Sequence, residues 1–287
     1  MRRVAVGVLL LICLGMAHVF LLENTSRAQR VLPQPQDSGY VLPGPLLRLI
    51  AGEFRGLAAD IYFLKGLVTF GRTLEQRVED AEKEQVWQQV FALLDAATDL
   101  DPYFFDPYYF ANASLSRNPA MVPKINTMLE KGLYLRDWDW MLPFYLGFNH
   151  FYYLQDNVKA SEYLMLGAQR PNAMPLLTTL AARLAYKGNR TENAIGFLRG
   201  ILSKTEDEKT RELYQTRLEA LEKIFYLERA VAYHLEQFGD EPKDLQALVR
   251  RGVIPEIPAD PYGGSFFIAD DGSIQSTSDL VYAKDGK

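Results

Sequence analysis

The hydrophobic and polar positions of the chain fall into four successive patterns. Residues 4–22 form an apolar run without a formal charge, and residues 31–45 hold four prolines and two glycines. From residue 46 to residue 238, apolar residues recur with the three-to-four-residue period of amphipathic helices, and there is almost no alternating strand pattern. After Gly239 the period breaks up into short segments. The pattern predicts a mainly α protein with four parts: an anchor segment (1–30), a proline-rich spacer (31–45), a helical domain (46–239) and a small C-terminal α+β module (240–287).

The first apolar run has the length of a membrane-spanning helix. It is 19 residues long, where a helix needs about 20 apolar residues to cross a bilayer core and the core of a signal peptide has 7 to 15. Arg2 and Arg3 before the run favour a cytoplasmic N-terminus. We therefore expect a single-pass anchor in the inner membrane, with the bulk of the chain in the periplasm. The alternative is a signal peptide cleaved before Gln29, which would leave a soluble periplasmic protein.

Residues of similar size recur at a constant spacing within the helical domain. Ala97, Gly132 and Gly167 are 35 residues apart, and so are the leucines three positions before them. The next copy is offset by 34 residues. Recurrence at this period indicates a stack of repeated helical hairpins. The residues expected to pack between repeats are Leu94, Ala97, Leu129, Gly132, Leu146, Gly147, Ala160, Leu164, Gly167, Leu180, Ala181, Ala194 and Leu198.

The best-defined unit resembles the tetratricopeptide repeat family. Leu146 and Gly147 stand in its first helix, Ala160 and Gly167 in its second, and Pro171 closes it. The resemblance implies a solenoid of helical hairpins, about four in number, that binds another protein or a peptide.

The resemblance covers about residues 53–205 and is degenerate. The tryptophan expected early in the first helix is missing, and the first unit has a charged insertion at residues 72–84. In the last copy, Asn189 and Glu192 have the spacing of a capping box and are expected to begin a helix. A long amphipathic helix over residues 206–238 is expected to cap the array.

The segment after Gly239 has a different character. A short helix is expected to follow Pro242 and to end near Gly252, and residues 270–272 form an Asp-Asp-Gly turn between two short strands. This tail is similar to the globular part of the major pseudopilins of bacterial type II secretion and type IV pilin systems. The resemblance rests on Gln237, Phe238, Gly239, Leu245, Leu248, Val249, residues 252–255 and residues 260–263.

The pseudopilin resemblance implies a role in assembling a secretion, pilus or other envelope complex. The N-terminal run lacks the processing glycine and glutamate of a pilin, so the chain is not expected to be a pilin itself. Asp260, Asp270 and Asp271 offer a weak calcium site, although an Asp-Asp-Gly turn requires no metal.

Composition limits the kinds of partner and site that the protein is expected to have. A net charge of −5 argues against nucleic acid as a partner. The single cysteine, Cys13, allows no intrachain disulfide or thiolate metal cage, and three scattered histidines predict no metal site. No cofactor is expected. His150 lacks a recognisable nucleophile and orienting carboxylate, and the aspartate pairs Asp99/Asp101 and Asp137/Asp139 stand where short polar residues end helices. We therefore expect no catalysis.

Aromatic residues are the densest chemical signal. Phe144, Phe148, Phe151 and Tyr152 fall on one side of a helix whose other side carries Leu146. Two interpretations remain open. These aromatics either pack the core of the solenoid, which is the usual place of large apolar side chains, or line a groove that binds a partner.

Three functions follow: a membrane-anchored adaptor that binds other proteins, a permanent structural subunit of an envelope complex, or an envelope enzyme without a sequence signature. The adaptor is the leading hypothesis. The sequence leaves the partner and the oligomeric state open.

Overall fold

The computed structural model describes residues 14–16, 41–75 and 80–281. The apolar run at residues 4–22 and the spacer at residues 31–45 therefore lie mostly outside the described residues. None of the helices described is both long and apolar enough to cross a membrane.

The described chain is mainly helical, as the sequence predicts, and carries one small antiparallel sheet. Within residues 41–281, the elements in chain order are α2 (Gly44–Ala51), a 3-10 turn (Gly52–Phe54), α3 (Arg55–Glu75), α4 (Asp80–Leu100), α5 (Asp106–Leu115), a second 3-10 turn (Pro119–Met121), α6 (Val122–Leu133), α7 (Met141–Tyr152), α8 (Asn157–Ala168), α9 (Pro175–Lys187), α10 (Thr191–Leu202), α11 (Glu208–Phe238), α12 (Leu245–Arg250), β1 (Phe266–Ile268) and β2 (Ile274–Ser276).

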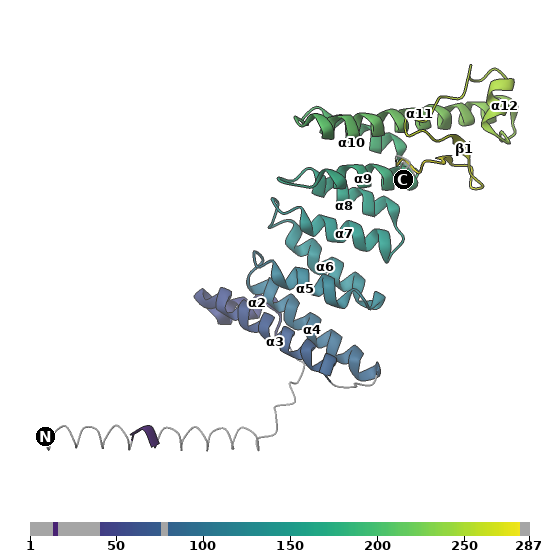
Figure 1. Cartoon of the computed structure of the whole chain (residues 1–287). Helices are drawn as coiled ribbons and strands as arrows, with labels where there is room; N and C mark the ends of the chain where they lie inside the picture. Colours follow the sequence, from purple (N-terminus) through teal and green to yellow (C-terminus); the bar gives the residue numbers. More distant parts are fainter. Residues whose placement is uncertain (1–13, 17–40, 76–79, 282–287) are drawn as a thin grey trace, which may run out of the picture.

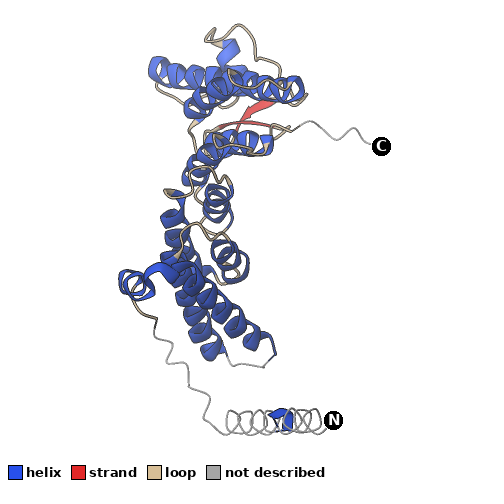
Figure 2. Ribbon diagram, turned by 90° about the vertical axis from the view of Figure 1, so that its left-hand side faces the viewer, coloured by secondary structure: helices blue, strands red, loops and turns tan. Residues whose placement is uncertain are grey.

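The helices stack in chain order along one direction, each packed against the next, from α3 to α11 (Figure 1). Turned by 90°, the stack follows an arc (Figure 2). Helices α5, α7 and α9 begin 35 and 34 residues apart, and so do α6, α8 and α10. This arrangement of repeated hairpins is compatible with a helical solenoid.

Glycine allows close approach where helices of the array cross. A Cβ atom added at Gly147 in α7 would lie 2.7 Å from Cγ of Leu164 in α8, and one added at Gly132 in α6 would lie 2.7 Å from the Tyr108 ring in α5. Both distances are shorter than van der Waals contact, so a larger residue would push the helices apart. The spacing of small residues thus marks real helix contacts.

Twelve of the thirteen residues expected to pack between repeats are buried, and Leu180 is half-buried. Helices α4, α6 and α8 end at Leu100, Leu133 and Ala168, as the repeat spacing predicts. Their leucines and alanines belong to the cores that hold neighbouring hairpins together.

The charged residues 72–84 lie partly at the end of α3, which continues to Glu75, and partly at the start of α4, which begins at Asp80. Two local expectations need correction. Asn189 does not cap α10: it adopts a left-handed φ of 56°, and Arg190 takes the N-cap position. The helical domain begins at Gly44 rather than after Pro45, since proline is well accommodated in the first helical turn.

The tail forms the expected short helix and hairpin. Strand β1 pairs antiparallel with β2, with Phe266 opposite Ser276. The apolar side chains of the tail, including Leu248 and Ile274, share one hydrophobic cluster with residues of α9, α10 and α11. The hydroxyl of Tyr186 in α9 donates to the carbonyl of Ile274 over 2.7 Å. The tail is therefore packed onto the end of the helical array and has no separate core.

Candidate protein-binding surface

A chain of aromatic rings runs from α5 to α7. The ring of Tyr109 lies 6.2 Å from that of Phe105 and 6.3 Å from that of Tyr145, measured between centroids. Further along α7, Phe148 stacks on Tyr152 at 5.4 Å with nearly parallel planes. Contacts of this geometry fix the rings in place, so the surface is built before any partner binds.

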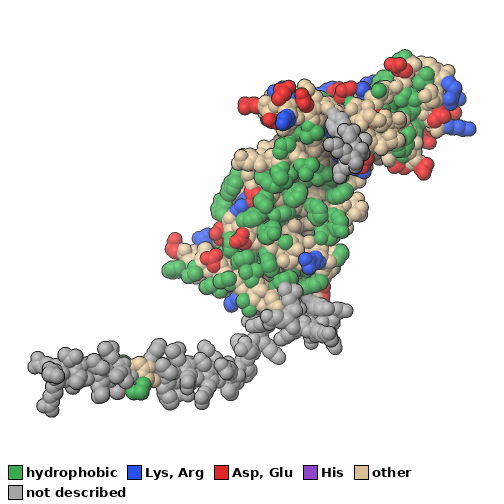
Figure 3. Space-filling model, in the orientation of Figure 1, with side chains coloured by type: hydrophobic (Ala, Val, Ile, Leu, Met, Phe, Trp, Pro, Cys, Tyr) green, Lys and Arg blue, Asp and Glu red, His purple; other side chains and the backbone are tan. Residues whose placement is uncertain are grey.

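Much of this chain is open to solvent. The exposed fractions are 50% for Tyr109, 39% for Phe148, 38% for Phe151 and 58% for Tyr152. We call these four residues, together with the buried Tyr145 that contacts Tyr109, the aromatic face. In the orientation of Figure 1, apolar side chains gather over the middle of the array (Figure 3). A soluble protein rarely leaves neighbouring large apolar side chains uncovered without a binding role.

Phe144 is less exposed than the other aromatic residues on the same side of α7. It is half-buried and packs against the cores on both sides of its helix, with its ring 5.7 Å from that of Tyr145. Of the four residues proposed for a groove, Phe148, Phe151 and Tyr152 are exposed, whereas Phe144 supports them from below. Tyr109 was not among the candidates, because its helix is one repeat earlier.

The opposite side of α7 anchors the aromatic face through a buried polar cluster. The Asn149 amide donates to Oδ1 of Asn112 in α5 over 2.9 Å and to Oδ1 of Asn126 in α6 over 2.8 Å. The hydroxyls of Ser116 and Tyr153 lie 3.2 Å apart. Buried hydrogen bonds of this kind fix the register of packed elements, so α5, α6 and α7 hold one relative position.

The aromatic face consists of phenylalanine and tyrosine side chains, without Asp, Glu, Lys or Arg among its five residues. Burial, with smaller contributions from Tyr109 and Asp139, raises the pKa of Tyr145 to about 12, which keeps its phenol neutral. The face thus offers ring surfaces and phenol hydroxyls, which suit apolar side chains and hydrogen-bonding groups of a protein segment.

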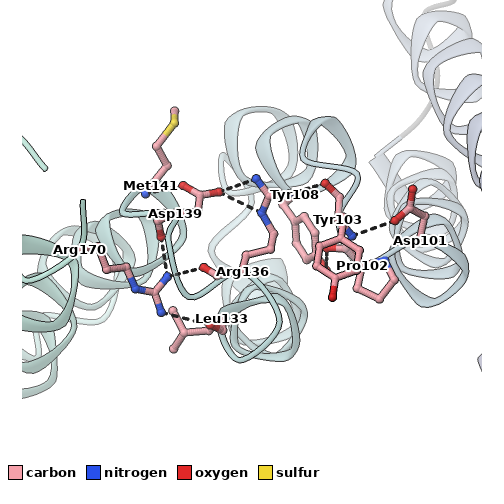
Figure 4. Close-up of polar contacts among 9 residues, drawn as sticks. All are labelled: Asp101, Pro102, Tyr103, Tyr108, Leu133, Arg136, Asp139, Met141 and Arg170. Carbon is pink, nitrogen blue, oxygen red and sulfur yellow. Dashed lines mark hydrogen bonds and ion pairs between the residues drawn. The ribbon is translucent and has the colours of Figure 1, made fainter. Parts of the chain in front are cut away.

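Arginine side chains form hydrogen bonds with the turns where successive hairpins meet (Figure 4). Arg136 forms two hydrogen bonds to Oδ2 of Asp139, at 3.0 and 2.8 Å, and donates to the carbonyl of Tyr103. Arg170 donates to the carbonyls of Leu133 and Arg136, at 3.1 and 2.9 Å. Burial lowers the pKa of Arg170, and Asp139 opposes that effect. The Asp139 carboxylate is therefore structural.

Two other aspartates near helix ends also contact neighbouring groups. Oδ1 of Asp101 accepts from the Tyr103 backbone N–H over 2.9 Å, and Asp99 pairs with Lys131 at 2.7 Å. The Asp101 contact lies in the turn after α4 and fits the expectation that such residues end helices, whereas the Asp99 carboxylate joins α4 to α6.

His150 is buried against α8. Its Nδ1 lies 3.8 Å from Oδ2 of Asp156, and its ring stacks on Tyr163 at 5.4 Å. Burial lowers the pKa of His150, with Asp156 opposing. A carboxylate is thus nearby, which the sequence did not reveal. Tyr163 is the hydroxyl beside it, and burial together with a hydrogen bond to Glu130 raises the pKa of Tyr163, so this hydroxyl is a poor nucleophile.

Two of the aspartates named for the calcium alternative form hydrogen bonds within the tail. Asp260 accepts hydrogen bonds from the hydroxyls of Ser276 and Ser278, and Oδ1 of Asp271 accepts from the Ser273 hydroxyl over 2.6 Å. Among the described residues there is no group of three or more His, Cys, Asp or Glu side chains placed to hold a metal ion. Asp260 and Asp271 instead stabilise the turns of the tail.

The structure also contains a hollow that the sequence analysis did not predict. It has a volume of about 630 Å³ and lies between α10, α11 and the loop after α12, where Ile195, Phe225 and Ile254 line it beside the charged Arg199 and Glu222. Tyr226 and Tyr233, seven residues apart along α11, stand on its wall. The seven-residue spacing of these two tyrosines is a sequence signal for the hollow, but the same spacing occurs in an ordinary amphipathic helix.

Comparison of the chain with protein-family models, with curated proteins and with solved structures gives no match. The function is therefore argued from the surface itself.

Proposed function

We propose that this protein is a membrane-anchored adaptor with tetratricopeptide-like repeats, which binds a partner protein through its aromatic face on the periplasmic side of the inner membrane. The exposed rings of Phe148, Phe151 and Tyr152 carry the proposal. All three are large aromatic side chains, and the rings of Phe148 and Tyr152 are stacked on each other. Large aromatic side chains are among the residues that dominate binding energy in protein interfaces.

The repeats supply the rigidity that such a surface needs. Small residues at the helix crossings and the Asn149 cluster hold α5 and α7 in register, so binding does not have to order the rings first. A partner segment with two or three apolar side chains spaced along the ring chain fits this surface best.

The remaining parts of the proposal come from the sequence. The apolar run at residues 4–22 supports an anchor, and the pseudopilin-like residues of the tail support a role in assembling a secretion, pilus or other envelope complex. In this proposal the tail serves as the end cap of the array, because its apolar side chains cover α9–α11.

Paired serine substitutions test the proposal. The double variant Phe148→Ser/Phe151→Ser, purified as the full chain in detergent from the cells that express it, should lose a co-purifying partner by about tenfold or more, since truncating one central aromatic costs about 2 kcal/mol of binding. Far-UV circular dichroism should remain helical. The control is Tyr226→Ser/Tyr233→Ser on α11, whose rings are 45% and 52% exposed.

The control pair should retain the partner. Equal loss from both pairs would point to general stickiness of exposed rings, and retention by the α7 pair would contradict the proposal. A partner that stays bound at constant stoichiometry through detergent extraction would identify a permanent subunit rather than an adaptor.

A further inference from the structure

Helix α3 is the first long helix of the array and is apolar on two opposite sides. One side packs against α4: Ala59 and Thr69 are buried there, and Cδ2 of Leu94 would lie 3.1 Å from a Cβ added at Gly66. The opposite side is exposed. Terminal helices of repeat arrays normally present a polar outer face, which keeps the array soluble.

The exposed side forms a regular seam. Its residues are spaced by three and four positions in alternation, the pattern of core positions in a coiled coil. Each side chain is between 45% and 73% exposed. We define this seam as Phe54, the last residue of the 3-10 turn, together with Leu57, Ile61, Leu64 and Val68 of α3.

The spacing indicates a helix as the occupant of the seam. A repeat of 3.5 residues keeps one stripe facing a partner helix along its whole length, and the charges beside the seam distinguish such a partner from a membrane surface. The exposed charged residues from Glu53 to Lys65 are Glu53, Arg55, Asp60 and Lys65. With two acidic and two basic residues, they do not form the cationic border that favours an anionic lipid surface.

We propose that the seam pairs with the same seam of a second copy of this chain, as a parallel two-helix contact. In a parallel coiled coil, a residue just before one core position lies beside the residue five positions later on the partner helix. Asp60 of each copy then lies beside Lys65 of the other, which gives two ion pairs. An antiparallel pairing centred on Ile61 would instead place the two Asp60 carboxylates together.

This inference goes beyond the proposed function and rests on α3 and the 3-10 turn before it. The aromatic face lies on α5 and α7, so variants of the seam and of the aromatic face can fail independently.

Disulfide trapping in the full chain tests the pairing. Cys13 is the only cysteine, so a Cys13→Ser background allows single cysteines to be placed at will. Ile61→Cys should form disulfide-linked dimers under mild oxidation in detergent about tenfold more than Tyr134→Cys, because facing core positions lie within disulfide reach. Tyr134 is 85% exposed and lies outside the seam.

Charge reversal tests the parallel register. Asp60→Lys and Lys65→Asp should each raise the dissociation constant of the dimer about fivefold, since each puts like charges together at two exposed sites. The double reversal Asp60→Lys/Lys65→Asp should restore pairing. Dimer yields of Ile61→Cys no higher than those of Tyr134→Cys, or linkage of Ile61→Cys to a different protein, would overturn the proposal. A double reversal that pairs no better than the single ones would overturn the parallel register.

Discussion

Arg170 donates a hydrogen bond of 2.9 Å to the backbone carbonyl of Arg136, the arginine that reaches back in turn to the carbonyl of Tyr103. The two arginines are 34 residues apart, one repeat length. Each therefore closes the turn at the end of the preceding hairpin. Arg170 also donates to the carbonyl of Leu133, the last residue of α6. A carbonyl at a helix end has no partner within its own helix, and this side chain supplies one.

Replacing Arg170 by methionine should destabilise the array. The carbonyls of Leu133 and Arg136 would lose charged donors, at a cost of about 2 kcal/mol in the free energy of unfolding. Urea denaturation followed by circular dichroism measures the change. Arg190→Met, at an exposed position, is the control and should change stability by less than about 0.5 kcal/mol. Equal effects of the two substitutions would refute the role given to Arg170.

Two glycine-to-alanine substitutions should have opposite signs. Gly147→Ala brings a methyl group to 2.7 Å from Cγ of Leu164, and such overpacking costs about 1–3 kcal/mol. Gly196 in α10 has no neighbour within 4 Å of an added Cβ, so Gly196→Ala should stabilise by up to about 1 kcal/mol through helix propensity. Thermal unfolding compares them. Stabilisation by both would mean that α7 and α8 do not approach closely at Gly147.

His150 should make stability depend on pH. Its pKa is lowered from 6.5 chiefly by burial, so the unfolded chain binds the proton more readily than the folded one. The stability contributed by the neutral ring is present above the unfolded pKa and is lost as pH falls through the lowered pKa of the folded state. His150→Asn should therefore lose less stability than the wild type between pH 7.5 and pH 5 in urea titrations. Parallel losses in both proteins would contradict this account.

Asp260 should stabilise the tail without a metal. Burial alone would raise its pKa, but hydrogen bonds from Ser276, Ser278 and the Tyr262 and Gly264 backbone amides lower it below 3.8. Its contribution is thus present above that value and is lost as pH falls through the lower, folded-state pKa. Asp260→Ala leaves these donors unpaired and should cost about 2 kcal/mol.

The melting temperature of the wild type should be the same in calcium and in a calcium chelator. A rise with calcium that Asp260→Ala abolishes would restore the calcium site.

The sequence predicted the repeats because helix contacts restrict residue size. Gly147 had to be small to admit Leu164, and that constraint recurs at a fixed spacing. It could not predict that Asn189 would turn left-handed instead of capping α10, since both roles favour asparagine. The docking of the tail also escaped prediction: Tyr186 and Ile274 are 88 residues apart, and no local pattern records such a contact.

The aromatic face was predicted only in part, because local periodicity does not give the burial of a side chain. Periodicity gives the side of α7 on which a residue lies, which placed Phe148 and Tyr152 together. Burial depends on the neighbouring helices, so the half-buried position of Phe144 and the contribution of Tyr109 from α5 required the fold. The second apolar side of α3 was likewise hidden, because two apolar stripes on one helix merge into a nearly uniform hydrophobic run.

Photo-crosslinking from position 148 tests the central claim most directly. A photoreactive phenylalanine analogue in place of Phe148, in the full chain within intact cells, should give a discrete crosslinked product with a partner protein, because the side chain would lie inside the interface. The same analogue at Tyr226 should give none of that product. Crosslinking from neither position, or equal crosslinking of the same protein from both, would contradict the claim that the aromatic face binds a partner.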